Sequence, residues 1–145
     1  MNSIEFFKIC EYNNIKGGFL MLEFFEYDDN AGSASIYDSH ITFNKALLRY
    51  FKDAYRVRLA VDRVNKDVYI YVVNKDYALS GELKESSLLN VSISKTYARV
   101  CSRPAVEYIC SVFGLEIEKK EFKRFKARYD DEKKVIVIDM KGDVQ

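Results

Sequence analysis

Runs of tyrosine, phenylalanine, valine and isoleucine recur along the chain, and short polar turns separate them. In residues 55–61, apolar side chains alternate with arginines, and the apolar run 68–73 follows after a polar turn. Residues 122–129 and 135–140 repeat this form around a turn of acidic and basic residues. Alternation with a period of two indicates a strand with one buried face, and two such runs joined by a short turn indicate a β-hairpin. The pattern therefore predicts two hairpins and a fold built mainly from strands.

A short segment with helical periodicity precedes each hairpin. Residues 45–52 place apolar side chains on one face, and Asn44 stands before them at a favourable N-cap position. In the second segment, Ser102 takes the cap position, Pro104 lies in the first turn, and Gly114 follows as a residue that can end the helix. An extended segment precedes each helix, at residues 34–43 and 91–101.

The order of strand, helix and hairpin therefore occurs twice, and we expect an α+β, mostly β fold made of two β-α-β-hairpin units. Outside these units, aromatic runs at 3–12 and 19–28 flank a turn rich in asparagine and glycine, which predicts an N-terminal β-hairpin. We expect residues 1–145 to form a single domain. Its expected parts are the N-terminal hairpin, the first unit, a connection and the second unit, at residues 1–33, 34–73, 74–90 and 91–140.

A chain of 145 residues is long enough to bury one sizeable core. Its three cysteines, Cys10, Cys101 and Cys110, have no C-x-x-C spacing, so we expect neither a disulfide framework nor a zinc site. The sequence shows no secretory signal pattern and no run of about 18 apolar residues, the length that a membrane helix needs. We therefore expect a cytoplasmic protein without a membrane partner, and its oligomeric state stays open.

Few side chains suggest catalysis. His40 is the single histidine, and the sequence assigns no nucleophile or carboxylate partner to it. The carboxylate clusters at 28–29 and 130–132 fall in turns, where acidic residues are common for backbone reasons. The Lys-Gly-Gly run at 16–18 precedes a strand instead of opening a helix, so it lacks the form of a phosphate-binding loop. We expect no enzyme activity, no catalytic residue, no bound metal, no cofactor and no small-molecule substrate.

The charges divide the chain into an acidic front and a basic remainder. Residues 1–43 hold two basic and seven acidic side chains, whereas basic residues outnumber acidic ones from 44 to 134. Arg56 and Arg58 share one strand face, and four cations are interleaved with aromatic residues in 122–129. Such cations bind phosphates non-specifically, and a strand or helix that carries them can enter a groove of DNA. Charged residues on exposed strands also discourage edge-to-edge aggregation, so an ordinary solvated surface is the alternative interpretation.

The first helix and its flanks read I-T-F-N-K-A-L-L-R-Y-F at 41–51, and the second helix ends in F-G-L at 113–115. The turn of the second hairpin reads D-D-E-K at 130–133. This unit resembles the AbrB/MazE swapped-hairpin family, whose helices end in a similar L-G-I and whose hairpins carry D-D-E-K. In that family one unit cannot close its own barrel, and two chains exchange hairpins to do so. The resemblance implies that two tandem units form one AbrB-like barrel here, as an internal pseudo-dimer.

The resemblance also implies a function. AbrB-like members use arginines around the strand and helix on DNA, and the matching positions here are Arg49, Arg99 and Arg103. The overall pattern is also similar to small proteins of phages and integrative elements in Firmicutes. We therefore hypothesise a non-enzymatic DNA-binding transcription regulator from a mobile element, with double-stranded DNA as its partner. The expected contact residues are Arg49, Arg56, Arg58, Arg99, Arg103 and Arg124.

A protein-binding module is the alternative hypothesis. The N-terminal segment sets acidic residues beside aromatic ones, which suits a basic partner surface and is common in interfaces. Such a module would sequester a host protein, as an antitoxin-like inhibitor or a phage anti-defence (anti-CRISPR) factor does. The expected contact residues are Glu23, Phe25, Glu26, Tyr27, Asp28 and Asp29.

Overall fold

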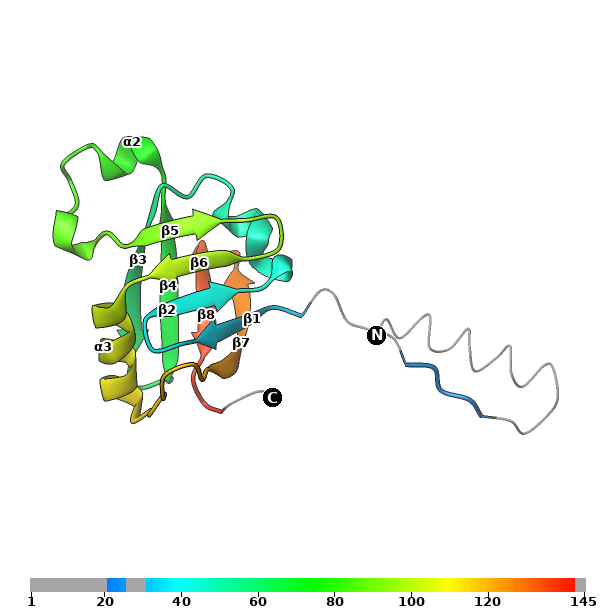
Figure 1. The fold of residues 1–145 in the computed structure, drawn as a ribbon. Coiled ribbons are helices and arrows are strands. Elements are labelled where there is room, and N and C mark those ends of the chain that lie inside the picture. The colour runs from blue at the N-terminus through cyan, green and yellow to red at the C-terminus, as the bar shows by residue number, and fades with distance from the viewer. Residues whose placement is uncertain (1–20, 26–30, 143–145) are drawn as a thin grey trace. The chain divides into compact units, whose positions relative to one another are not determined.

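The computed structural model describes residues 21–25 and 31–142, and the chain divides after Asn30 into two units. From Ala31 onward the structure is mostly β: eight antiparallel strands form a sheet that curls into a nearly closed barrel (Figure 1). The strands are β1 Ser33–Ile36, β2 His40–Phe43, β3 Arg56–Asp62, β4 Asp67–Val73, β5 Asn90–Ile93, β6 Ala98–Cys101, β7 Lys123–Asp130 and β8 Val135–Asp139. The helices, in which η marks a 3-10 helix, are η1 Lys45–Phe51, α2 Lys75–Ala78, η2 Glu85–Ser87 and α3 Arg103–Phe113.

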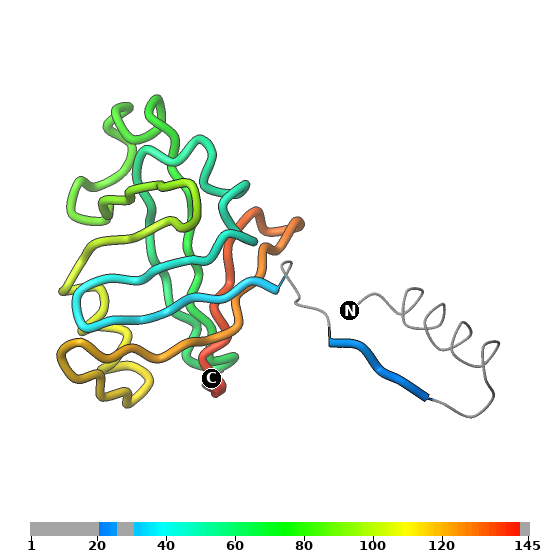
Figure 2. Tube along the Cα trace, turned by 45° about the vertical axis from the view of Figure 1, so that its right-hand side comes forward, coloured from blue at the N-terminus to red at the C-terminus, as the bar shows by residue number. Residues whose placement is uncertain are grey.

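Hydrogen-bonded neighbours follow the order β3-β4-β8-β7-β1-β2-β6-β5, and the path of the chain through this order can be traced in Figure 2. The first and last strands of the order, β3 and β5, meet at a bridge. There Val57 and Leu89 exchange backbone hydrogen bonds of 3.0 and 2.8 Å. Along the chain, hairpin β1–β2, helix η1 and hairpin β3–β4 are followed by hairpin β5–β6, helix α3 and hairpin β7–β8.

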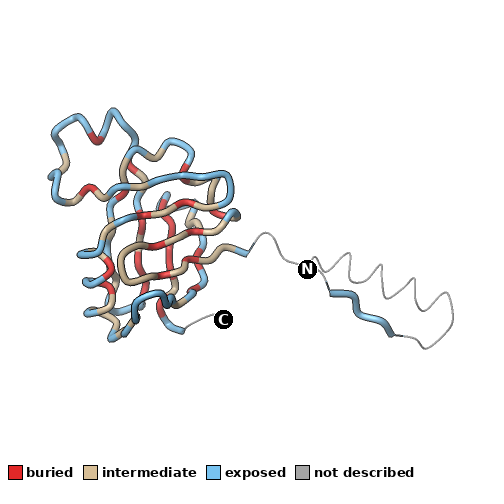
Figure 3. The backbone as a smooth tube through the Cα atoms, viewed as in Figure 1, coloured by how far each residue is buried: buried red, intermediate tan, exposed pale blue. Residues whose placement is uncertain are grey.

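Buried positions alternate with more exposed ones along β1, β2 and β6, whereas β8 has four consecutive buried residues; Figure 3 marks the buried positions along the chain. On β1 and β2, the side chains of Ile36, Ile41 and Phe43 are almost fully buried, while their neighbours along each strand are partly exposed. Phe43 packs against Phe51 of η1, with ring centroids 5.1 Å apart. Burial of one large apolar side chain contributes about 1.5–3 kcal/mol. The interior is therefore a packed core that the short helices help to close.

Helix α3 begins and ends where the sequence predicts. The Oγ atom of Ser102 accepts a hydrogen bond of 3.2 Å from the amide of Ala105, and Gly114 ends the helix with a φ of 67°. The apolar face of the helix buries Val106 and Ile109 in the core. The predictions of Ser102 as N-cap and of Gly114 as the helix end are confirmed.

Asn44, in contrast, does not cap the helix that follows it. Its Oδ1 atom accepts a hydrogen bond of 3.1 Å from the amide of Ser33, and its Nδ2 atom donates one of 2.8 Å to the carbonyl of Ala31. The N-cap prediction for Asn44 is therefore wrong, because the side chain ties the start of β1 to the end of β2 instead. Helix η1 is a 3-10 helix that is anchored by the buried side chains of Leu47 and Phe51.

Both predicted hairpins are confirmed, as β3–β4 and β7–β8. The segments 34–43 and 91–101, predicted as one extended run each, are each a hairpin of two short strands. The amide of Tyr37 donates a 2.9 Å hydrogen bond to the carbonyl of His40 in the first of these turns, and Ser94 closes the second in the same way. Strands of four residues are too short to show two separate alternating patterns, so the sequence pattern did not predict the turns between them.

Acidic residues of the β3–β4 and β7–β8 turns serve the backbone. Oδ1 of Asp62 accepts two hydrogen bonds of 3.0 Å from the amides two and three residues further on. Asp130 does the same at 3.0 and 3.1 Å. These amide donors hold the pKa of both carboxyl groups below its ordinary value, and the amide three residues further on has the largest effect in each turn. Lys66 and Lys134 end the two turns in the left-handed region, each at a φ of 57°.

Residues 74–90 connect the two successions of hairpin, helix and hairpin. They carry α2 and η2, and their apolar side chains form a small separate cluster with β4, made of Val73, Ala78 and Leu88. Asn74 caps α2, because its Oδ1 atom accepts a hydrogen bond of 2.8 Å from the amide of Tyr77. This connection is thus folded onto one end of the β3–β4 hairpin.

Of the N-terminal unit, the structure describes residues 21–25, which belong to no helix or strand and have exposed side chains. The predicted strand 3–12 lies outside the described residues, as does the remainder of the predicted strand 19–28. Within the described parts of the chain, no helix has the length and apolar character needed to cross a membrane.

Candidate nucleic-acid interface

Five neighbouring strands form a continuous part of the sheet, in the order β7, β1, β2, β6 and β5. One side of this part faces away from the core. Their inward side chains, such as Ile36, Ile41 and Val100, are buried, so the alternate residues point outward. Antiparallel pairing places the outward residues of adjacent strands opposite each other. We call these outward residues the outer face; most of them are polar or basic.

One row of cross-strand partners runs across the outer face. Arg124 of β7 lies opposite Ser35 of β1, which lies opposite Thr42 of β2. Thr42 in turn lies opposite Arg99 of β6, and we call these four residues the basic row. Because β7 and β6 are three strand positions apart, the backbones at the two arginines are separated by about 14 Å. Two cations therefore flank a strip of small hydroxyl side chains.

Both arginines of the basic row lie near aromatic rings. The Cζ atom of Arg124 is 5.6 Å from the ring centroid of Phe122, and that of Arg99 is 5.2 Å from the ring centroid of Tyr97. The Nε atom of Arg99 is buried and has no hydrogen-bond partner among the described residues. Lys126 adds a third cation two residues further along β7. Within residues 21–25 and 31–142 none of these three cations forms an ion pair, so their charges are available to an anion.

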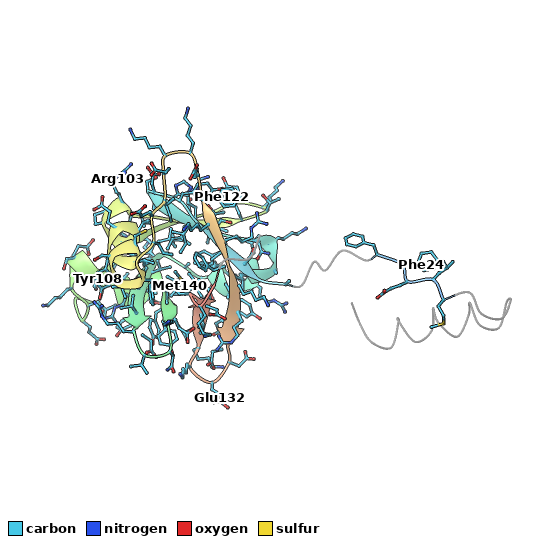
Figure 4. All side chains as sticks on the ribbon, turned by 90° about the horizontal axis from the view of Figure 1, so that it is seen from below. Phe24, Arg103, Tyr108, Phe122, Glu132 and Met140 are labelled. Atoms are coloured by element: carbon cyan, nitrogen blue, oxygen red, sulfur yellow. The ribbon has the colours of Figure 1, made fainter. Side chains whose placement is uncertain are left out.

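A row of aromatic rings lies beside the basic row. The ring of Tyr37 stacks on that of His40, with centroids 4.4 Å apart and planes at 15°. Tyr37 also contacts Phe122, which precedes β7 (Figure 4), with centroids 5.1 Å apart and planes at 33°. Tyr37 contacts both of the other rings, so the three side chains hold one another in place. The aromatic row therefore stiffens the outer face.

His40 is the group on the outer face whose charge changes closest to neutral pH. Partial burial lowers the pKa of its imidazole, the guanidinium of Arg99 lowers it further, and Asp38 acts in the opposite direction. Its Nδ1 atom lies 3.2 Å from the Oγ atom of Ser39. The imidazole is therefore neutral at pH 7, and acidification adds a positive charge beside the basic row.

We expect replacement of His40 by glutamine to flatten the pH dependence of stability between about pH 8 and pH 5. The unfolded chain takes up the proton near the ordinary histidine pKa of about 6.5, whereas the folded chain takes it up at lower pH. Wild-type stability therefore falls as the pH falls through this window. Urea unfolding midpoints at both ends of the window measure the effect. Asp62 and Asp130 do not interfere, because their pKa values lie below the window. Parallel curves for wild type and variant would contradict the expectation.

The structure brings two of the six predicted arginine contacts, Arg99 and Arg124, into one row. Arg103 lies at the start of α3 (Figure 4) and forms an ion pair of 3.5 Å with Asp38. Asp38 belongs to the β1–β2 turn, so Arg103 borders the outer face, but its charge is partly balanced.

The other three predicted arginines lie elsewhere. Arg56 and Arg58 are on β3, which is not one of the five strands of the outer face, and Arg56 forms an ion pair of 3.8 Å with Glu85. Arg49 is on η1, with its Cζ atom 5.4 Å from the ring centroid of Tyr50. These residues therefore do not extend the basic row.

The residues of the alternative, protein-binding hypothesis belong to the N-terminal unit. Glu23 and Phe25 are described, and both are exposed; the side chain of Phe25 is the most exposed large apolar one of residues 21–25, at 88%. The remaining four, Glu26, Tyr27, Asp28 and Asp29, lie outside the described residues.

Sequence reasoning missed the residues between and beside the two arginines. Ser35 and Thr42 occupy a segment that was predicted as one strand, and Tyr37 and His40 flank the unrecognised turn. The Asp-Ser pair at 38–39 is a turn signal that would have divided the segment. With the turn in place, the alternation of small polar and apolar residues on each side would have indicated two strands with a polar outer side.

The outer face combines guanidinium groups, an ammonium group and hydroxyls, which are donors that suit phosphate oxygens. In the described parts of the chain, no group of three or more histidine, cysteine, aspartate or glutamate side chains is placed to hold a metal ion. These donors stand on β7, β1, β2 and β6, each of which pairs with a strand on both sides. No protein-family model, curated protein or solved structure matches this chain.

Proposed function

We propose that this protein is a non-enzymatic DNA-binding regulator of the AbrB-like type, and that the outer face binds the DNA backbone. The observation that carries the proposal is the basic row. At the ordinary spacing of neighbouring strands, the backbones at Arg124 and Arg99 are about 14 Å apart, close to the width of a major groove, about 12 Å. Guanidinium groups bind phosphates through paired hydrogen bonds, and the small side chains of Ser35 and Thr42 leave room between them.

The strand order supports the AbrB-like part of the proposal. The chain repeats the succession of hairpin, helix and hairpin, and corresponding strands of the two copies meet: β2 pairs with β6, and β4 pairs with β8. In addition, β1 of the first copy pairs with β7 of the second. Each copy thus needs strands of the other to complete the barrel, as expected of an internal pseudo-dimer.

The aromatic row favours duplex over single-stranded DNA as the partner. Proteins that bind single strands offer flat ring faces on which successive bases stack. Here the Tyr37 and His40 rings cover each other, and Arg124 lies near the ring of Phe122. The groups of the basic row are cations and hydroxyls, which contact phosphates without reading bases.

Replacing both Arg99 and Arg124 with glutamine is expected to weaken binding of a random duplex by about tenfold or more per arginine. Each hydrogen bond to a charged group contributes about 1.5–3 kcal/mol, and each lost phosphate contact reduces the salt slope of log K by about 0.9. Fluorescence anisotropy titrations between about 50 and 200 mM salt measure both quantities. The wild type should lose affinity steeply over this range.

Arg58→Gln is the matched control, because it removes an exposed arginine from β3, outside the outer face. It should leave the affinity and the slope nearly unchanged. An equal loss in this control would place the binding surface elsewhere. Wild-type binding that ignores salt, or no binding of duplex at low salt, would refute the proposed function.

A second candidate, a protein-binding inhibitor or antitoxin-like module that sequesters a host protein, is favoured by residues 21–25. Met21, Phe24 and Phe25 have 67%, 53% and 88% of their surface exposed, beside the carboxylate of Glu23. Apolar side chains exposed together commonly mark interaction sites. Failure of the duplex titration with a folded wild-type protein would leave this candidate as the better supported one.

A further inference from the structure

His40 stands beside the basic row without belonging to it. It precedes Thr42 by two residues on β2, so the side chains of both residues point to the outer face. Thr42 lies opposite Arg99, which makes His40 and Arg99 diagonal neighbours across β2 and β6, about 7–8 Å apart along the sheet. A phosphate that Arg99 holds is therefore within reach of the imidazole.

One nitrogen of the His40 ring has a neighbour within the protein, and the other faces solvent. The Nδ1 atom lies 3.2 Å from the Oγ atom of Ser39, and the ring is held in place by its stack on Tyr37. The Nε2 atom forms no hydrogen bond with a residue in the described parts of the chain, and it is not among their buried polar atoms that lack a partner. It is therefore accessible to a ligand. Both nitrogens of a protonated imidazole are donors, and a bond from Nε2 to a phosphate oxygen is then charge-assisted.

The groups around His40 keep its imidazole neutral in the free protein. Partial burial and the guanidinium of Arg99 on β6 lower the pKa of His40, and together they outweigh the carboxylate of Asp38 in the β1–β2 turn. Asp38 also forms an ion pair of 3.5 Å with Arg103 of α3. The residue directly opposite His40 on β6 is Cys101, which bears a thiol.

A bound phosphate reverses this balance. Its negative charge offsets that of Arg99 and favours the protonated imidazole, so the pKa of His40 should be higher in the complex than in the free protein. Protonation and phosphate binding then strengthen each other by the same factor, because the coupling of two binding equilibria is reciprocal.

We propose that His40 is a further phosphate-binding residue of the outer face and that duplex DNA binds it in its protonated form, so that complex formation takes up a proton. This inference rests on the proposed function and adds a dependence on pH to it. His40 is the single histidine of the chain, and no other type of side chain has an ordinary pKa between about 5 and 8. A change of affinity in this range therefore has one expected source.

Anisotropy titrations of the random duplex at about pH 8 and about pH 5.5 test the coupling. The wild type should bind about three- to tenfold more tightly at the lower pH, because a hydrogen bond from a charged donor is stronger than one from a neutral donor. The salt slope of log K should also steepen, by up to about 0.9. His40→Gln keeps a polar side chain without the charge, so its affinity should be the same at both pH values. His40→Lys is charged at both and should bind tightly at both.

The Cε1 proton of His40 reports the protonation state directly, since the chain has no second histidine signal. An NMR titration of the wild type should give a higher pKa with saturating duplex than without it. Salt-dependent binding with equal affinity at both pH values, or an equal pKa in the free and bound states, would overturn the inference and leave the proposed function standing. A pH dependence that persists in His40→Gln would assign the proton to another group and would also overturn it. Absence of duplex binding at either pH would refute the proposed function and this inference together.

Discussion

Replacement of Phe43 by alanine is expected to lower the free energy of unfolding by about 3–5 kcal/mol. Phe43 has no exposed surface, and its ring packs against that of Phe51 with centroids 5.1 Å apart. Its cross-strand partners on β1 and β6 are Ala34 and Ala98, whose side chains are too small to fill the space that the ring would leave. The variant therefore loses the free energy gained by burying the ring, and the unfilled cavity adds its own cost.

Urea unfolding followed by circular dichroism measures this loss. Since small domains are stable by only about 5–15 kcal/mol, the loss removes a large part of the stability and should lower the urea midpoint clearly. Phe122→Ala removes the same ring from a position with 44% exposure, and its expected loss is much smaller. Similar losses for the two variants would mean that Phe43 does not lie at the centre of the core.

The parts of the fold that followed from the sequence are those with long alternating strands. In the hairpin β3–β4 both strands have 7 residues, so the alternation of β3 and the apolar run of β4 are each long enough to be recognised. The strands β1, β2, β5 and β6 have 4 residues each, and every one of them was merged with its neighbour into a single extended segment. The mostly β class was therefore predictable, whereas the number of strands was not.

Capping shows the same limit at the level of single residues. Ser102 and Asn44 both precede a helical pattern, and both residue types are good N-caps. Ser102 caps α3, but Asn44 bonds to the amide of Ser33 and the carbonyl of Ala31 instead. Local propensity cannot show that residues 31–33 will supply these competing partners, because they come from another part of the chain.

The basic row depends on register, which the local sequence does not contain. Arg124 and Ser35 are far apart in the chain and meet because β1 pairs with β7. Thr42 and Arg99 meet in the same way across β2 and β6. A shift of either register by one residue would turn the arginine toward the core. The sequence predicted six contact arginines, and only the pairing of the strands shows that Arg99 and Arg124 lie in one row.

Replacement of Gly32 by alanine is the second change with a large expected effect, a loss of about 1–3 kcal/mol in the free energy of unfolding. A Cβ atom at this position would clash with the carbonyl oxygen of Ala127 and would lie 3.1 and 3.2 Å from two side-chain carbons of Leu47. The leucine can adjust, but the carbonyl belongs to the backbone of β7. The amide of Ala127 also donates a 3.1 Å hydrogen bond to the carbonyl of Gly32. This bond holds the backbones of Gly32 and β7 close together.

Gly142→Ala is the matched control, because no atom of the described residues, apart from its chain neighbours, lies within 4 Å of the Cβ position there. Alanine also restricts the unfolded chain, which stabilises by about 0.4–1 kcal/mol at an unstrained site, and the control measures this opposing term. The difference between the two variants in urea unfolding therefore isolates the clash. Since relief of the clash requires β1 to move away from β7, the basic row should be disturbed as well, with Arg124 displaced from Ser35. Gly32→Ala should thus lose both stability and duplex affinity. Unchanged stability relative to Gly142→Ala would show that β1 does not approach β7 so closely at this position.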